Sequence, residues 1–452
     1  MNYLGEFASV FLLVSLVAAL GLVWWRQWVR HVQSTFLNSI KWIMLEVRLP
    51  RDVFKSPLAM EMVLNTIHQG GGTSTWYAKF WDGKVRNWFS LEIASIEGDV
   101  RFYIRANSKF KNVIESALYA QYPGVEVTEV KDYADAIRYD SEKHEVWGND
   151  FALAGEDVIP IRTYVDYGLG KDPKEEYKVD PITPLIEWMG SVKKGEQIWF
   201  QIICRAVDGK FDEWKIDAQR AINKIYYGLP ITNDELKEKK KEADAEHKEA
   251  RKIDEKAQSS FPQAKKEADL SYSDKQKVEA IYNNIAKLGF EVMIRVAYIT
   301  DKDKFDPRNI DGVTGCMRQF GHGNFNSFRP DGTTSFDFPW EDRTGIKLIN
   351  KKEEAVAKIQ KRKGFYKALS NEDWYNGIPE RIFHDVKDAF SIRFFAIDSK
   401  KAFSKPKDDP TRFILNTEEL ATIFHFPGQT AAVPSLKRIP STKAEPPINL
   451  PL

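Results

Sequence analysis

The sequence predicts an α+β protein that a single N-terminal helix anchors in a membrane. Two observations predict this architecture. No charged side chain lies between Phe7 and Trp25, and from Trp42 onward alternating apolar stretches and amphipathic stretches follow one another in a regular order. A third observation is that 29% of all residues are charged, which is typical of a water-exposed body behind the anchor.

The segment from Phe7 to Trp25 reads FASVFLLVSLVAALGLVWW. About 20 apolar residues in a helix cross the ~30 Å hydrocarbon layer of a bilayer, so this segment is just long enough. A helix is expected because the backbone must satisfy its own hydrogen bonds in lipid. The residues expected to hold the anchor are Phe7, Leu12, Leu16, Leu20, Trp24 and Trp25.

The flanking charges predict the orientation of this anchor, residues 1–30. Glu6 is the only charged residue before the span, whereas five basic residues follow it closely: Arg26, Arg30, Lys41, Arg48 and Arg51. Positive residues stay on the cytoplasmic side, so we expect a single-pass protein of the inner or plasma membrane, with its N-terminus outside and its bulk in the cytoplasm. A cleavable signal peptide is the alternative, but a basic leader and an A-x-A-like site are missing.

Residues 31–140 are expected to form a first compact domain. A strand at 42–48 precedes a helix that Ser56 caps and Pro57 begins. Two strands, 88–94 and 99–105, are separated by a hairpin turn. A helix with Val113, Ile114, Ala117 and Leu118 on one face and the strand 125–130 then follow. The order βαββαβ is that of a ferredoxin-like sandwich, in which two helices cover one face of an antiparallel sheet.

Residues 141–345 are expected to form a second ferredoxin-like domain. Its expected elements are a strand at 161–168, a helix at 181–192, strands at 197–207 and 290–300, a segment at 313–320 and a strand at 392–398. A helical insertion interrupts this domain at about 210–289. The middle of the insertion, 236–258, is charged on all sides, so we expect a helix that projects into solvent or lies against a partner.

Residues 346–426 are expected to contain a basic region, a final strand and an amphipathic helix, before a proline-rich tail at 427–452. The basic side chains are candidate nucleic-acid contacts, because neutralised phosphates release counterions, and Phe365 and Tyr366 could add stacking. A solvated helical face, or one that meets the acidic surface of a partner, is the alternative. The candidate contacts are Lys351, Lys352, Lys358, Lys361, Arg362 and Lys363.

The segment FILNTEELATIFHFPG, which starts at Phe413, predicts a short helix. Asn416 and Glu419 have the spacing of a capping box. Leu420, Ile423 and Phe424 form a single apolar face, which predicts docking, with a partner protein as the candidate.

The motifs of common enzymes are missing from the sequence. We find no phosphate-binding loop, H-E-x-x-H or G-x-S-x-G pattern, and the seven histidines and two cysteines are scattered. The glycine-rich segment 319–331 contains His322 and could hold a phosphate or a base, but its phenylalanines favour a structural loop. The net charge of +1 gives no global attraction to nucleic acid. We therefore expect no enzyme, no cofactor and no metal.

The segments FILNTEELATIFHFPG, VPSLKR and KAEPPINLP resemble the region that precedes the motor domain in membrane-anchored relatives of type IV secretion coupling ATPases, the pumps of conjugative DNA transfer. The chain is similar, from about Trp42 to Leu452, to an uncharacterised membrane-anchored family of candidate-phylum bacteria of this type. The resemblance implies a motor that acts in trans, because this sequence carries no phosphate-binding loop.

The resulting hypothesis is a non-enzymatic membrane-anchored scaffold or adaptor that docks a motor ATPase. Its expected partners are membrane lipid and that ATPase, with a homo-oligomer as a further candidate. The alternative is a membrane-tethered nucleic-acid-binding module that uses the basic stretch 343–367.

Overall fold

The structure, a computed structural model, describes residues 2–50, 55–69, 75–170, 179–207, 213–227, 270–336, 338, 340–362, 364–365, 410–427, 436 and 438. Several expected features therefore lie outside the described residues. These are the strand at 392–398, the charged stretch 236–258, Lys363, Tyr366 and the tail apart from Pro427, Leu436 and Arg438.

The first half of the body has the predicted order of elements. Its elements are β1 (Trp42–Arg48), α2 (Pro57–Ile67), α3 (Trp76–Phe80), β2 (Phe89–Ile96), β3 (Asp99–Asn107), η1 (Ser108–Phe110), α4 (Lys111–Gln121) and β4 (Glu126–Val130). The strands are antiparallel in the order β4-β1-β3-β2. Ser56 accepts a hydrogen bond from the backbone of Leu58, which confirms the predicted cap. Glu97 and Gly98 both have positive φ, 54° and 86°, in the β2–β3 turn, as a tight hairpin requires.

The second half contains η2 (Tyr133–Ala136), β5 (His144–Leu153), α5 (Thr183–Gly190), β6 (Glu196–Ala206), β7 (Gly289–Asp301), α9 (Arg308–Met317), η8 (Arg318–Phe320) and β8 (Phe328–Asp331). Its strands follow the order β6-β7-β5-β8, and β9 (Phe413–Asn416) pairs with β7. The expected strand at 161–168 is wrong, because these residues form an irregular segment with turns. The first strand of the second half is instead β5, which pairs with β7.

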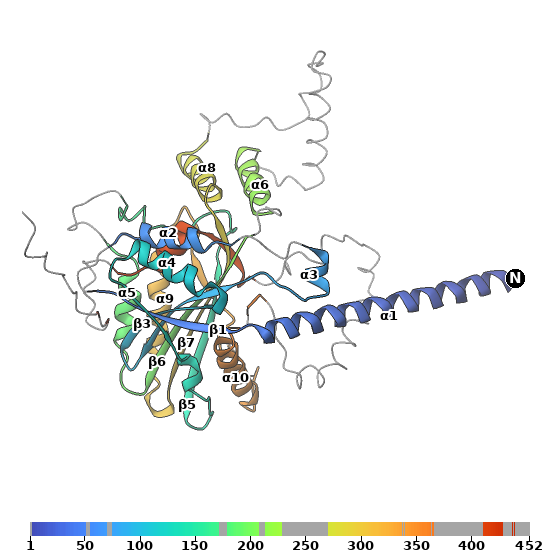
Figure 1. The fold of residues 1–452 in the computed structure, drawn as a ribbon, viewed down its shortest axis with the longest axis horizontal. Coiled ribbons are helices and arrows are strands. Elements are labelled where there is room, and N and C mark those ends of the chain that lie inside the picture. The colour runs from blue at the N-terminus through green and yellow to red at the C-terminus, as the bar shows by residue number, and fades with distance from the viewer. Residues whose placement is uncertain are drawn as a thin grey trace, which may run out of the picture.

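The two halves share one nine-stranded sheet, because β2 pairs antiparallel with β6 along its whole length. The protein is therefore an α+β structure with a large antiparallel sheet. Helices α2, α4, α5, α9 and α13 (Thr417–Ile423) cover one face of this sheet and bury the main apolar core (Figure 1). This face carries the apolar set of each strand, for example Leu91 and Ile93 of β2.

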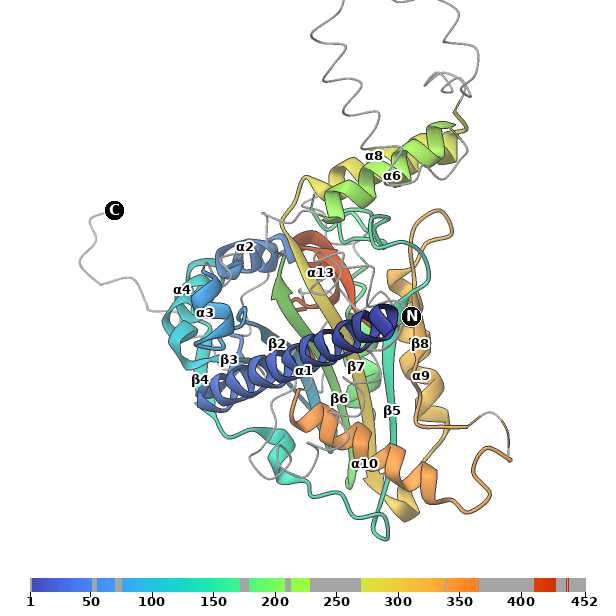
Figure 2. The ribbon, with the colours of Figure 1, turned by 90° about the vertical axis from the view of Figure 1, so that its right-hand side faces the viewer.

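The opposite face of the sheet is covered by α10 (Ile346–Gln360) and η2. A smaller apolar cluster forms there around Trp199 of β6, with Val356 and Ile359 of α10. Figure 2 shows α10 crossing the strands on this side. Polar side chains occupy much of the remaining face.

A helical pair, α6 (Glu213–Tyr227) and α8 (Tyr272–Ile285), projects from one end of the sheet (Figures 1 and 2). Trp214, Ala218 and Ile222 of α6 pack with Ile281 of α8 and with Ile414 of β9. The expected insertion therefore begins and ends with these two helices.

Helix α1 (Asn2–Ser39) is continuous and extends away from the body (Figure 1). Only Ile40 and Lys41 separate it from β1. The predicted span at 7–25 falls mostly on residues whose side chains lie outside the described part of the chain. Within the described part, no helix combines the length and apolar character that crossing a membrane needs.

Candidate functional site

A row of polar side chains crosses the sheet on the face that α10 covers. The strand register aligns Glu92 of β2 with Gln201 of β6, Gln201 with Arg295 of β7, and Arg295 with Asp150 of β5. All four side chains are buried. Because buried charges are costly unless they are paired, the contacts of this row decide what chemistry this face can carry.

Arg362, directly after α10, inserts into this row. Its Nε and Nη2 donate hydrogen bonds to the two carboxylate oxygens of Glu92 at 3.0 and 2.9 Å. Its Nη1 and Nη2 donate to Asp132 at 2.6 and 2.9 Å. Tyr133 donates its hydroxyl to Glu92 at 2.6 Å. The side chains of Arg362 and Glu92 are 1% and 0% exposed, so this is a completely internal, bidentate ion pair.

The electrostatics of this cluster keep both charges in place. Burial alone would raise the pKa of Glu92, but the charge and hydrogen bonds of Arg362, with those of Ser90 and Tyr133, hold it below its ordinary value. Burial raises the pKa of Tyr133 well above its ordinary value. A general base needs a free lone pair and a pKa near the working pH. Glu92 has neither, so the cluster is suited to a structural role.

The basic stretch that includes Arg362 was a candidate nucleic-acid contact, and the structure corrects this for Arg362. Phosphates cannot reach a guanidinium that is buried and paired with two carboxylates. The helix turns this side chain toward the sheet because α10 packs its apolar face, Val356 and Ile359, on the same strands.

Three lysines of the same stretch also have partners within the chain. Lys352 pairs with Glu145 and Lys358 with Asp150. Lys351 donates to the carbonyl of Ser335 at 3.0 Å and lies 4.8 Å from the centre of the Phe336 ring. Lys361 is exposed. Lys352, Lys358 and Arg362 therefore pair with acidic side chains of their own chain.

The predicted docking face on α13 is wrong as a surface for another protein. Leu420, Ile423 and Phe424 are 0% exposed and belong to the main core. The predicted capping box of this helix is confirmed, since the side chains of Asn416 and Glu419 each bond the backbone of the other. Glu419 also accepts a hydrogen bond from the backbone of Ile161 at 2.9 Å. Its burial raises its pKa to about 8.

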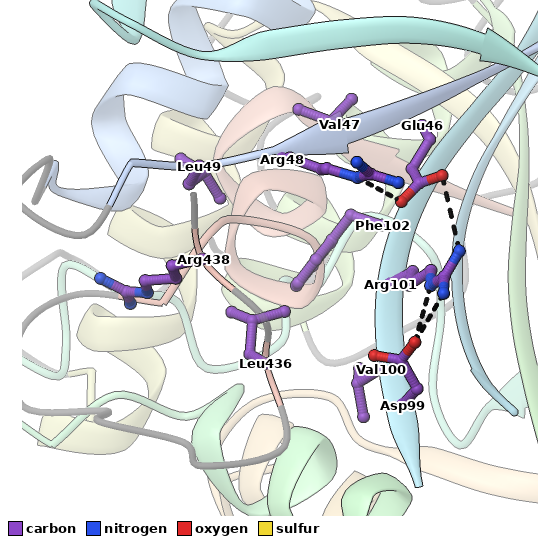
Figure 3. A pocket seen from close by; sticks show the side chains of 10 residues that line it. All are labelled: Glu46, Val47, Arg48, Leu49, Asp99, Val100, Arg101, Phe102, Leu436 and Arg438. Carbon is purple, nitrogen blue, oxygen red and sulfur yellow. Dashed lines mark hydrogen bonds and ion pairs between the residues drawn. The ribbon is translucent and has the colours of Figure 1, made fainter. Parts of the chain in front are cut away.

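A surface pocket of about 200 Å³ lies where Leu436 and Arg438 meet β1 and β3 (Figure 3). Leu436 forms a parallel bridge with Val100 of β3. The Nη2 of Arg101 donates to Asp99 at 2.6 Å, and the Nε of Arg48 donates to Glu46 at 2.7 Å. These two lining guanidinium groups already hold carboxylates, and the third, that of Arg438, donates to the carbonyl of Pro427 at 3.0 Å. The pocket is therefore interpreted as a contact between the tail and the sheet.

The glycine-rich segment 319–331 is a structural loop that leads into β8. Phe320 and Phe328 are buried. The amide of Asn326 donates to the carbonyls of Glu156 and Ile159 and accepts from the backbone of Gly155 at 2.8 Å. The phenylalanines thus hold the loop on the body, as the structural alternative expects.

Metal-ligand clusters and the two cysteines are further candidates for a site among the residues that the structure describes. Among these residues, no three His, Cys, Asp or Glu side chains converge as a metal site would need. Cys204 and Cys316 are both free and buried. Burial raises the pKa of the Cys204 thiol well above its ordinary value and that of Cys316 to about 11, so neither is activated.

An aromatic patch at the junction of α1 and α3 is the feature that our sequence reasoning missed. The rings of Trp25 and Trp76 stack with their centres 5.9 Å apart. The indole of Trp28 donates to the carbonyl of Phe80 at 3.1 Å. The outer rings are exposed, with Trp24 and Trp76 at 61%. The signal in the sequence was the aromatic density of WYAKFW, which starts at Trp76.

Comparison with protein families gives a match. A family model described as "Domain of unknown function (DUF8128)" matches residues 32–327, which is more than half of the chain and includes strands β1 to β7. No curated protein matches the chain.

Proposed function

The chain belongs to the family described as "Domain of unknown function (DUF8128)", and on this premise we propose that it is a non-enzymatic, membrane-anchored scaffold that docks a motor ATPase supplied by another chain. The proposed setting is a type IV secretion-like or DNA-transfer apparatus in the inner or plasma membrane. Residues 7–25 of α1 would cross the bilayer once, with the N-terminus outside and the sheet in the cytoplasm.

The observation that carries this proposal is the contrast between the interior and the periphery of the molecule. Glu92 and Arg362 are among the most deeply buried charged residues, and they pair with each other while Arg362 also pairs with Asp132. Exposed apolar side chains lie on the projecting elements, α1 with α3 and α6 with α8, and also on α2, α4 and α10. Contiguous exposed apolar residues are typical of surfaces that bind lipid or protein.

The pair α6 and α8 is the proposed docking surface for the motor. It stands clear of the sheet (Figure 2), and Ile216 of α6 and Tyr282 of α8 are half-exposed. The pair is fixed at its base by Trp214. A fixed base with a few exposed apolar side chains among polar ones is suited to holding a partner in a fixed position.

We also propose that each half of the sheet is a ferredoxin-like domain. Three features support this proposal. The first half has the strand order β4-β1-β3-β2, and the second half, read from its outer edge, has the equivalent order β8-β5-β7-β6. The helix pairs α2/α4 and α5/α9 lie on the same face. The two domains would then be fused through their β2 and β6 edges.

The nucleic-acid alternative has less support. Arg362 is buried, and Lys351, Lys352 and Lys358 contact groups of their own chain. Phosphate binding would have to break these contacts before any counterions were released.

Co-purification from membranes tests the proposal. The full chain, tagged at Leu452, is extracted from its host with a mild detergent, and we expect an ATPase with a phosphate-binding loop to be recovered with it. Recovery of the chain without such an ATPase contradicts the scaffold function.

A pair of matched variants tests the docking surface. Ile216→Lys with Tyr282→Lys is expected to abolish recovery of the ATPase. Tyr119→Lys, at an exposed residue of α4, is the control and is expected to leave recovery unchanged. Equal recovery in both variants contradicts the placement of the surface on α6 and α8.

Protease treatment of cells stripped of their outer layers tests the topology. We expect the tag at Leu452 to survive, because the body is proposed to lie inside. Digestion of the tag would reverse the topology and remove the docking proposal with it.

A further inference from the structure

We propose that α3 and the residue that follows it, Trp81, form a second membrane contact, an interfacial anchor that lies in the headgroup layer beside the end of the spanning segment. The proposed occupant of this surface is a phospholipid bilayer. This inference rests on the proposed membrane anchoring by α1, and it adds a lipid-binding site formed by a part of the chain distant from the span in sequence.

The patch is built as a unit that is fixed to α1. Besides the Trp25–Trp76 stack, the ring centres of Trp28 and Trp81 are 5.6 Å apart, and Trp28 donates to the backbone of α3. Behind α3, the chain turns at Gly83, which has φ of 66°. A Cβ atom at Gly83 would lie 2.2 Å from the carbonyl oxygen of Val32 in α1, so the two backbones touch.

The outer side of this unit is apolar and open. Trp76 is 61% exposed, Tyr77 59% and Trp81 46%. Trp24, on the neighbouring surface of α1, is as exposed as Trp76. Large aromatic rings left open to this extent on a fixed element form a patch of the kind that marks a membrane or protein contact.

Two observations favour a bilayer over a protein as the occupant. The patch is continuous with the uncharged segment 7–25, since Trp24 and Trp25 end that segment and also belong to the patch. The rings are Trp and Tyr, whose apolar bodies and polar tips are enriched at the interface of membranes.

The charges around the patch match the same position. Arg26 and Arg30 follow the patch on α1, and Lys79 lies within α3. Lys84, just after α3, pairs with Asp82 at 3.1 Å. Basic side chains next to an aromatic belt are attracted to anionic headgroups. Together these residues place the headgroup layer at the level of Trp25 and α3.

Spin labelling of the full chain in vesicles of phosphatidylcholine and phosphatidylglycerol tests this inference. Labels are placed singly at Tyr77→Cys, at Leu12→Cys within the proposed span, and at Glu187→Cys. Glu187 is exposed on α5, on the side of the sheet away from α1 in Figure 1. The native Cys204 and Cys316 are buried, so the unmodified chain shows how little label they take.

The measurement compares relaxation of each label by oxygen, which concentrates in lipid, and by a nickel chelate, which stays in water. We expect the oxygen-to-nickel ratio to be highest at residue 12, intermediate at 77 and lowest at 187. An aqueous ratio at 77 with a lipid ratio at 12 overturns the interfacial anchor and leaves the α1 anchor intact.

Two other outcomes also overturn the inference and are distinct from the first. Aqueous ratios at both 12 and 77 remove the membrane anchor itself, and with it the proposed function. A label at 77 that neither reagent reaches shows that a protein surface, such as a second copy of the chain, covers the patch.

Discussion

Arg362→Met separates the two roles that the sequence left open for the basic stretch. The substitution keeps an unbranched side chain of similar length at a residue whose φ is 43°, so backbone strain is the same before and after. It removes all contacts to Glu92 and Asp132. Glu92, which is 0% exposed, is left as a buried carboxylate without its cation.

Loss of one partner from a buried ion pair costs about 3–5 kcal/mol of unfolding free energy. We expect the upper part of this range, because Arg362 serves two carboxylates. Replacing both partners with apolar groups is often close to neutral. The double variant Arg362→Met with Glu92→Met should therefore be more stable than the single variant.

The loss should also depend on pH. In the native protein the pKa of Glu92 is depressed, so its stabilisation is present above its unfolded-state pKa and is lost as the pH falls below it. In the variant, burial without the cation raises this pKa. Stability is then lost as the pH rises, and the difference between the two proteins grows from acid to neutral pH.

Urea unfolding of the full chain in detergent micelles, followed by tryptophan fluorescence, measures these changes. A loss below about 1 kcal/mol would show that Arg362 behaves like a surface cation. A double variant less stable than the single one would refute the account of a buried pair. Unchanged stability with lost nucleic-acid binding would restore the nucleic-acid alternative.

Three further changes probe other parts of the molecule. Gly83→Ala should lower the unfolding free energy by more than about 1 kcal/mol and increase the mobility of a spin label at residue 77, because a Cβ cannot fit against Val32. Unchanged mobility of the label counts against the contact of α3 with α1. The pKa of Glu419 is raised to about 8 from 4.5, so its contribution to stability is complete below pH 4.5 and is lost as pH rises through about 8. Glu419→Gln, which keeps the capping box, should therefore reduce the dependence of the unfolding free energy on pH, as measured by urea unfolding at several pH values. The same pH dependence in the variant and the native protein contradicts this prediction. Leu420→Ala should lower the unfolding free energy by about 2–5 kcal/mol. If the variant keeps native stability but no longer binds the ATPase, the assignment of α13 to the core is wrong.

The elements of the first half could be predicted because local signals and tertiary packing agree there. Ser56 and Pro57 define the start of α2, and Glu97 with Gly98 define the β2–β3 turn. Each strand carries its apolar set on the face that α2 and α4 cover. Local preference and burial thus point to the same structure.

The sequence did not predict β5, because two of its residues are suited to the strand only through contacts with distant parts of the chain. Gly148 weakens a strand, yet a Cβ there would lie 3.4 Å from the side chain of Ala355 in α10, so glycine suits the close approach of that helix. Asp150 also reads as a turn residue. It is in the strand because Arg295 and Lys358 neutralise it.

The pairing of Arg362 with Glu92 could not be predicted for a similar reason. The two residues are 270 positions apart, and nothing in either neighbourhood specifies the other. Basic stretches are read as surface because charges are seldom buried. The sheet reverses this expectation by presenting carboxylates at the place where α10 ends.

The short connection between α1 and β1 has a mechanical consequence. The carbonyl of Lys41 accepts a hydrogen bond from the backbone of Ser108 at 2.8 Å, and the backbone of Ile40 donates to the carbonyl of Leu37 at 3.2 Å. These bonds restrict rotation of α1 relative to β1. A tilt or rotation of α1 is then transmitted to β1 and, through the neighbouring strands, to the whole sheet. Any partner that fixes α1 therefore sets the orientation of the whole body.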